Sequence, residues 1–262
     1  MANIPRQLQK YRDVIEKSKL EYVKVIICDE KVKVDIDDSK LGGYPCLPKN
    51  IEYPYDSKGN PLILQAQLNF NEIPTLNSYP KTGLLQFYLA LDDVYGMNFD
   101  NPTDQKDFRL IYVKEYDKNN RQTDFSFVDN HLKSSSCTLP VIKQFRLTFE
   151  KDYDYVSMQD CRFEKFFGME YDEFIDKFPS KHEEVVEEFF NRRGHKIGGY
   201  ANFIQNDPRS NSSYKDYIQI LQLDSEDDKI CWGDVGVGNF FTTEEKLVKL
   251  DFSSSVLYNY DC

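Results

Sequence analysis

The feature that most constrains the fold is an internal likeness between two distant segments of the chain. Lys40–Tyr44 reads KLGGY and Lys196–Tyr200 reads KIGGY. A glutamine in a strand-like segment follows the second glycine of each run. Gln67 lies 24 positions after Gly43, and Gln222 lies 23 positions after Gly199. A glycine and an aromatic pair follow each glutamine: Gly83 with Phe87-Tyr88, and Gly236 and Gly238 with Phe240-Phe241. Such features, repeated in the same order at nearly the same spacing, indicate that one unit occurs twice.

The composition indicates that this unit is rich in β-strands. The chain has 19 Phe and 18 Tyr but one Trp among 262 residues, and aromatic residues favour half-buried pleated surfaces. We therefore expect an α+β fold that is mainly β, in which two duplicated β-rich units pack pseudo-symmetrically. The units span about 40–115 and 196–251, within a single compact domain over 1–262.

Local periodicity places the individual elements. Alternation and turn residues predict strands at 22–27 and 32–36 before the first unit, and at 63–68, 83–89 and 108–113 within it. Helical spacing of apolar residues predicts an N-terminal helix from Pro5 to about Ser18. A second helix should precede the second unit. It should begin at Ser180, where Ser180 and Glu183 match a capping box.

Charge limits the classes of partner. The 33 basic and 44 acidic residues give a formal net charge of −11. Because phosphate backbones reward clustered lysine and arginine, nucleic acid is not an expected partner, whereas a basic protein is. The first twenty residues contain no apolar core of a signal peptide, and no stretch has the length of a membrane span. With six scattered cysteines, these observations predict a cytoplasmic protein that does not bind membranes.

The sequence contains no coherent catalytic, metal or cofactor motif. The cysteines form no C-x-x-C pair, and the serine runs do not resemble a nucleophile elbow. His182 and His195 lie about a helix length apart, at expected surface or capping positions, so they predict no metal site. We therefore expect no catalytic residue, metal or cofactor.

Seven residues are candidates for ligand binding, each with a structural alternative. Gln67 and Gln222 could line a shared groove or brace the turn backbone, because a polar side chain inside an apolar strand must be hydrogen-bonded. The run from Asp224 to Asp228 packs four carboxylates into five positions, which would suit a cation or a solvated turn. The other candidates could form a pocket wall or a tight turn: Tyr44, Tyr200, Trp232 and Asp234.

Several motifs together resemble a known family. They are GGYPCLP at 42–48, QAQLN at 65–69, LQLDS at 221–225 and WGDVG at 232–236. This set is similar to that of the bacterial YwqG family of uncharacterised cytosolic proteins, over roughly 42–251. The resemblance implies a fold and a compartment but no activity. The chain departs from the pattern at Tyr53-Pro54-Tyr55, where a tryptophan is expected.

Two functional hypotheses remain open. The first is a non-enzymatic cytosolic binding or protein-interaction protein, which includes an immunity-type role toward a basic toxin. The alternative is an enzyme or small-ligand receptor that acts in a cleft between the two repeats.

Overall fold

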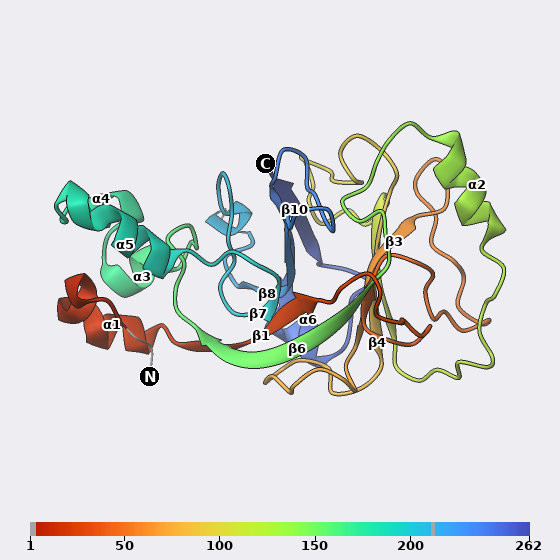
Figure 1. Cartoon of the computed structure of the whole chain (residues 1–262), viewed down its shortest axis with the longest axis horizontal. Coiled ribbons are helices and arrows are strands. Elements are labelled where there is room, and N and C mark those ends of the chain that lie inside the picture. Colours follow the sequence, from red (N-terminus) through yellow and green to blue (C-terminus); the bar gives the residue numbers. More distant parts are fainter. Residues whose placement is uncertain (1–3, 211–212) are drawn as a thin grey trace.

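The chain folds around one curled antiparallel sheet of ten strands (Figure 1). The computed structural model describes residues 4–210 and 213–262. Its strand order is β10-β9-β8-β7-β1-β6-β2-β3-β4-β5, and every neighbouring pair is antiparallel. The mainly β architecture is thus confirmed. The strands are β1 (Leu20–Ile27), β2 (Lys40–Leu41), β3 (Ile63–Asn69), β4 (Leu84–Leu89), β5 (Phe108–Val113), β6 (Phe145–Asp154), β7 (Lys196–Gly198), β8 (Tyr217–Asp224), β9 (Val237–Thr243) and β10 (Leu257–Asp261).

The helices are short and lie mostly at the two ends of the long axis (Figure 1). α1, α3, α4 and α5 gather at one end, and α2 lies at the other. Their bounds are η1 (Arg6–Tyr11), α1 (Arg12–Lys17), α2 (Ser126–Ser134), α3 (Phe163–Phe167), α4 (Tyr171–Ile175), α5 (Ser180–Phe190), η2 (Pro208–Ser210) and α6 (Glu244–Val248).

The centre of the sheet joins segments that are far apart in the sequence. β1 pairs with β6 along its whole length, from Leu20 opposite Asp154 to Ile27 opposite Leu147. Its other edge pairs with β7, where Val23 lies opposite Ile197. β6 in turn pairs with β2. β1 therefore contacts the strand group β7–β10, and β6 contacts the strand group β2–β5.

Gln67 and Gln222 make closely similar hydrogen bonds in the two flanking strand groups. The Gln67 side chain accepts from the backbone N–H of Cys46 at 2.9 Å and donates to the carbonyls of Ile36 and Asp38. Gln222 accepts from the N–H of Asn202 at 2.7 Å and donates to the carbonyls of Arg192 and Gly194. Each bond satisfies a polar group in a buried strand. Both amides thus brace the backbone around the KLGGY and KIGGY turns.

The connections into β2 and β7 differ greatly. Residues 28–39 join β1 to β2, whereas residues 155–195 join β6 to β7 and carry α3, α4 and α5. The strand expected at 32–36 is wrong. Side chains in this segment bond to local backbone, as when Asp38 accepts from the N–H of Asp35 at 2.7 Å. Local turns of this kind compete with strand pairing.

The N-terminal helix packs against the inserted helices. It is present as predicted, although its first part, η1, is a 3₁₀ helix. Leu8 and Ile15 are fully buried in one apolar cluster with Phe163, Phe174 and Phe190. The capping box at the start of α5 is wrong, because Pro179 occupies the N-cap position and no side chain makes a cap hydrogen bond. Ser180 is already helical, which places its hydroxyl one position too late.

No helix in the described part of the chain has the length and apolar character needed to cross a membrane.

Candidate functional site

A cleft of about 1440 Å³ lies between the inserted helices and the open end of the β8–β9 hairpin, where β8 begins and β9 ends. We call it the Asp160 cleft. One wall is the 158–172 segment with α3 and the start of α4. The opposite wall combines the 205–210 loop, the start of β8 and the start of α6. Every wall therefore comes from residues beyond β6.

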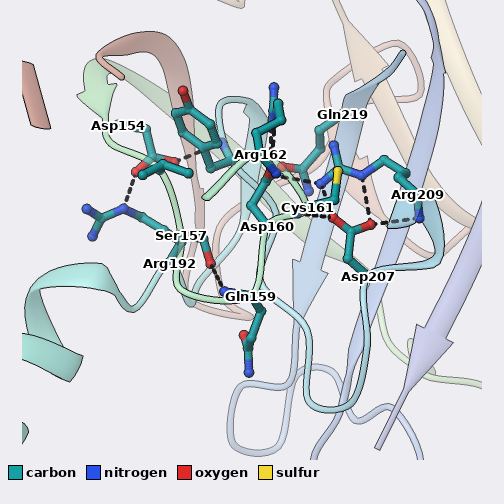
Figure 2. Close-up of polar contacts among 12 residues, drawn as sticks. Asp154, Ser157, Gln159, Asp160, Cys161, Arg162, Arg192, Asp207, Arg209 and Gln219 are labelled. Atoms are coloured by element: carbon teal, nitrogen blue, oxygen red, sulfur yellow. Dashed lines mark hydrogen bonds and ion pairs between the residues drawn. The ribbon is translucent and has the colours of Figure 1, made fainter. Parts of the chain in front are cut away.

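A buried ionic cluster forms the floor of the cleft (Figure 2). Arg209 donates to Asp160 at 2.8 Å and to Asp207 at 2.7 Å, and these three side chains are at most 1% exposed. Arg162 donates to Asp160 as well, with one bond to each carboxylate oxygen, at 2.7 and 2.6 Å. The guanidinium of Arg162 also lies 4.4 Å from the centre of the Tyr200 ring. Two carboxylates and two guanidinium groups balance, as buried charges must.

The charges in this cluster stabilise one another's ionised forms. Burial acts to raise the pKa of Asp160, but Arg209 and Arg162 outweigh it and hold that pKa below its ordinary value. Burial likewise acts to lower the pKa of Arg209, and Asp160 with Asp207 overcomes it and raises that pKa. Burial raises the pKa of the neighbouring Cys161 thiol to about 12. Cys161 therefore stays protonated at neutral pH and is a poor nucleophile.

The same place has the spacing of a metal site, but its charges do not fit one. One potential ligand atom each from Asp160, Cys161 and Asp207 lies within 4.8 Å of the others. Arg209 already donates to both carboxylates, so a metal ion would have to displace a buried guanidinium. It would also need the thiolate of Cys161, which burial disfavours. The cluster is better described as a structural ion network.

The rim of the Asp160 cleft is strongly acidic. Eight acidic and four basic side chains line the cleft, and the floor accounts for two of each sign. Six exposed carboxylates and two exposed lysines remain around the rim. Glu244 accepts from Ser78 at 2.6 Å, and Glu245 pairs with Lys249 at 2.6 Å. The other four rim acids are Glu164, Glu170, Asp172 and Asp216.

A second cavity of about 560 Å³ lies beside β1 and β6, where the chain enters β7. Its floor holds Asp154, which forms an ion pair with Arg192 at 2.6 Å (Figure 2). Asp154 also pairs with Lys196 at 3.0 Å. These side chains are 5%, 14% and 4% exposed. Unlike the Asp160 cluster, this floor carries two cations for one carboxylate.

The structure does not bring the seven sequence-predicted residues together. Tyr44 is 40% exposed, donates to Asp129 on α2 at 2.7 Å and stacks on Phe125. Tyr200 is buried and donates to the carbonyl of Ser18, next to α1. Because α1 and α2 lie at opposite ends of the molecule, these tyrosines do not face a common cleft (Figure 1).

The remaining candidates do not line the two cavities either. Trp232 is fully buried and packs against the rings of Tyr258 and Tyr260. Asp224 accepts from the N–H of Gly194 at 2.7 Å, whereas Asp234 is exposed. None of these, nor Gln67 or Gln222, lines either cavity. Their role in ligand binding stays a prediction.

The acidic run at 224–228 contacts a histidine that we expected near the surface. His195 is 6% exposed, and its Nε2 lies 2.9 Å from Glu226, which also pairs with Lys229. Nδ1 of His195 accepts from the N–H of Asp224 at 3.1 Å. No local pattern indicates this burial, because His195 follows directly after Gly194 in a turn. It is buried because β7 begins in the interior of the sheet.

Sequence reasoning missed the residues that form the two ionic clusters. Asp154, Asp160, Arg192, Asp207 and Arg209 match no motif, and ion pairs such as Asp160–Arg209 join positions 49 residues apart. The available signal was Asp-Pro-Arg at 207–209, which indicates a turn with a short-range ion pair.

A comparison with protein families places the chain. Residues 39–262 match the family described as a domain of unknown function (DUF1963). The chain belongs to that family. The DUF1963 region contains β2 to β10 and the inserted segment 155–195, which contributes to both cavities. β1 and the N-terminal helix precede this region. No curated protein matches the chain.

Proposed function

We propose that this DUF1963 protein is a non-enzymatic binding protein whose Asp160 cleft receives a basic segment of a partner protein. The observation that carries the proposal is the rim, where six exposed carboxylates face two lysines above a charge-balanced floor. Complementary charge of this kind steers association and selects partners. An immunity-type role toward a basic toxin is one specific form of this function.

The chemistry of the floor favours binding over catalysis. A general acid or base works best with a pKa near the working pH, and a nucleophile needs an activated form. Arg209 and Arg162 keep the pKa of Asp160 low, and burial keeps the Cys161 thiol protonated. The floor therefore supports the shape of the cleft, while the rim is left for a partner.

Three further points belong to the same proposal. The matching hydrogen bonds of Gln67 and Gln222 support two duplicated units that pack pseudo-symmetrically. The WGDVG motif at 232–236 supports a YwqG-like member of the family. The six cysteines, all unpaired, support a cytoplasmic location, where thiols are kept reduced.

The proposal is tested with a basic probe peptide and charge-neutralising variants. Isothermal titration calorimetry would measure binding of an oligoarginine peptide to the wild type and to a triple variant, Glu164→Gln, Glu170→Gln and Asp172→Asn. Each rim charge contributes about 0.5 kcal/mol, so the loss of three charges should weaken binding about tenfold.

A matched control separates the cleft from the overall charge. Glu52→Gln, Asp100→Asn and Glu115→Gln remove the same charge at exposed positions outside the cleft. This control should bind the peptide as the wild type does. Equal weakening in both triple variants would reject the cleft as the binding site, and a lack of saturable binding to the wild type would reject the basic partner.

A further inference from the structure

The cavity beside β1 and β6 has a charge pattern opposite to that of the Asp160 cleft. Its floor contains Arg192, Lys196 and Asp154, which leaves one positive charge in excess in a mostly buried place. An uncompensated buried charge is costly, so such a floor calls for an anion.

Asp154 cannot take more hydrogen bonds. One oxygen forms an ion pair with the Arg192 Nε at 2.6 Å and accepts from the N–H of Tyr155 at 3.0 Å. The other accepts from the Lys196 Nζ at 3.0 Å and from the N–H of Tyr200 at 3.1 Å. A carboxylate offers about four acceptor positions, so Asp154 is saturated.

Arg192 retains donors that point to no acceptor. Its Nε donates to the carbonyl of Tyr155 at 2.8 Å and forms an ion pair with Asp154, and its Nη1 donates to the carbonyl of Asn191 at 2.8 Å. Within residues 4–210 and 213–262, Nη2 has no hydrogen-bond partner, and Arg192 lines the cavity. The guanidinium is thus held in place by its other nitrogens while Nη2 stays available. Such a preorganised fork is well suited to an oxyanion.

We propose that this cavity binds one oxyanion, the carboxylate or phosphate group of a small molecule, on Nη2 of Arg192. Lys24 and Arg193 lie exposed at the cavity wall, and the Tyr22 side chain lines it as well. Burial, with a contribution from Asp154, raises the pKa of Tyr22 to about 12, so its hydroxyl keeps its proton as a donor. A volume of about 560 Å³ lies within the range of small-molecule sites.

The rim limits what the anion can belong to. Glu150, Asp152 and Glu188 are exposed around the same cavity. Their charges repel a polyanion such as a nucleic acid, whereas a single small anion reaches the floor past them. The ligand is therefore a small molecule with one anionic group.

The test measures binding of two simple anions to the full chain. Inorganic phosphate and acetate would be titrated at constant ionic strength, with sodium chloride as the reference, and binding followed by NMR chemical shifts. The wild type should bind at least one of them saturably, with a Kd on the order of 1 mM, and the preferred anion identifies the source of the oxyanion.

Arg192→Lys keeps the charge but removes the fork, and it should weaken binding about tenfold. Arg109→Lys is the matched control, because the Arg109 Nε also donates to a backbone carbonyl but lies on β5, outside the cavity. It should bind as the wild type does. If Arg192→Lys does not fold, Tyr22→Phe provides the second variant, with an expected loss of about threefold. No saturable binding to the wild type, or unchanged Kd values in the folded cavity variant, would overturn the proposal.

Discussion

Replacing Lys40 by methionine should stabilise the protein, although it removes a buried hydrogen bond. Lys40 is fully buried on β2, and its Nζ donates to the carbonyl of Ile36 at 2.7 Å. Among the described residues, no carboxylate lies within ion-pair distance of it. Lys40 lies opposite Gln67 in the sheet, and Lys196 lies opposite Gln222 in the same way. Lys196, however, is paired with Asp154.

The size of the effect follows from the pKa. Burial lowers the pKa of Lys40 from 10.5 to about 8. That gap of about 2.5 pH units costs the charged native state about 3.4 kcal/mol, at ~1.36 kcal/mol per unit. The lost hydrogen bond offsets about 1 kcal/mol. At pH 7, Lys40→Met should therefore increase the free energy of unfolding by about 2 kcal/mol.

The pH dependence gives a second check. Between about 8 and 10.5 the unfolded chain holds the Lys40 proton more tightly than the native state does, so wild-type stability rises with pH over that range. The advantage of Lys40→Met should shrink by about 2 kcal/mol between pH 7 and pH 9.5. Urea unfolding, followed by the fluorescence of Trp232, measures both values, since Trp232 is the single tryptophan.

Lys196→Met is the contrasting variant. It removes two buried hydrogen bonds, to Asp154 and to the carbonyl of Tyr200, and leaves both acceptors short of a donor, so it should destabilise the protein by about 3 kcal/mol. The reasoning would be refuted if Lys40→Met lowered the free energy of unfolding by more than about 1 kcal/mol, or if its effect were the same at pH 7 and pH 9.5.

Three other changes test the buried polar groups and the packing. Arg209→Met leaves Asp160 without its fully buried partner and should cost about 3–5 kcal/mol in urea unfolding; a loss below about 1 kcal/mol would contradict the ion network. Burial lowers the pKa of His195, against the opposing effect of a nearby carboxylate, so the native state should lose stability as the pH falls through the ordinary histidine value of 6.5. His195→Gln should therefore flatten the pH dependence of the free energy of unfolding between pH 7 and pH 5. An unchanged slope would mean that other groups cause this dependence. A Cβ at Gly238 would overlap the buried ring of Trp232, so Gly238→Ala should destabilise the protein by about 1–3 kcal/mol and shift the tryptophan emission; wild-type stability and emission would show that the ring can move away freely.

The sequence predicted those parts of the fold that depend on local pattern. β5 occupies the predicted 108–113, and β3 and β4 differ from their predicted ranges by one residue. The pairing of β1 with β6 and β7 could not be predicted in this way. It depends on contacts between residues at least 120 positions apart in the sequence, such as Ile27 with Leu147 and Val23 with Ile197.

The candidate sites were less accessible to prediction, because their residues come from irregular segments. The prediction that Gln67 and Gln222 must be hydrogen-bonded is confirmed, since both side chains bond to backbone groups. The ion pairs of Asp160 and Asp154 depend instead on how the 155–195 insertion folds over the second strand group. Neither charge pattern nor periodicity specifies that arrangement.

The place of β1 has a practical consequence for cutting the chain into pieces. The DUF1963 region begins at residue 39, so a fragment made to those limits would lack residues 20–27. Removing them would leave β6 and β7 with bare edges in the middle of the sheet, where unpaired backbone groups invite pairing between molecules. Such a fragment should aggregate on expression, and adding a synthetic peptide of residues 4–28 should restore soluble protein. β1, which lies outside the family limits, therefore joins the two halves of the sheet between β6 and β7.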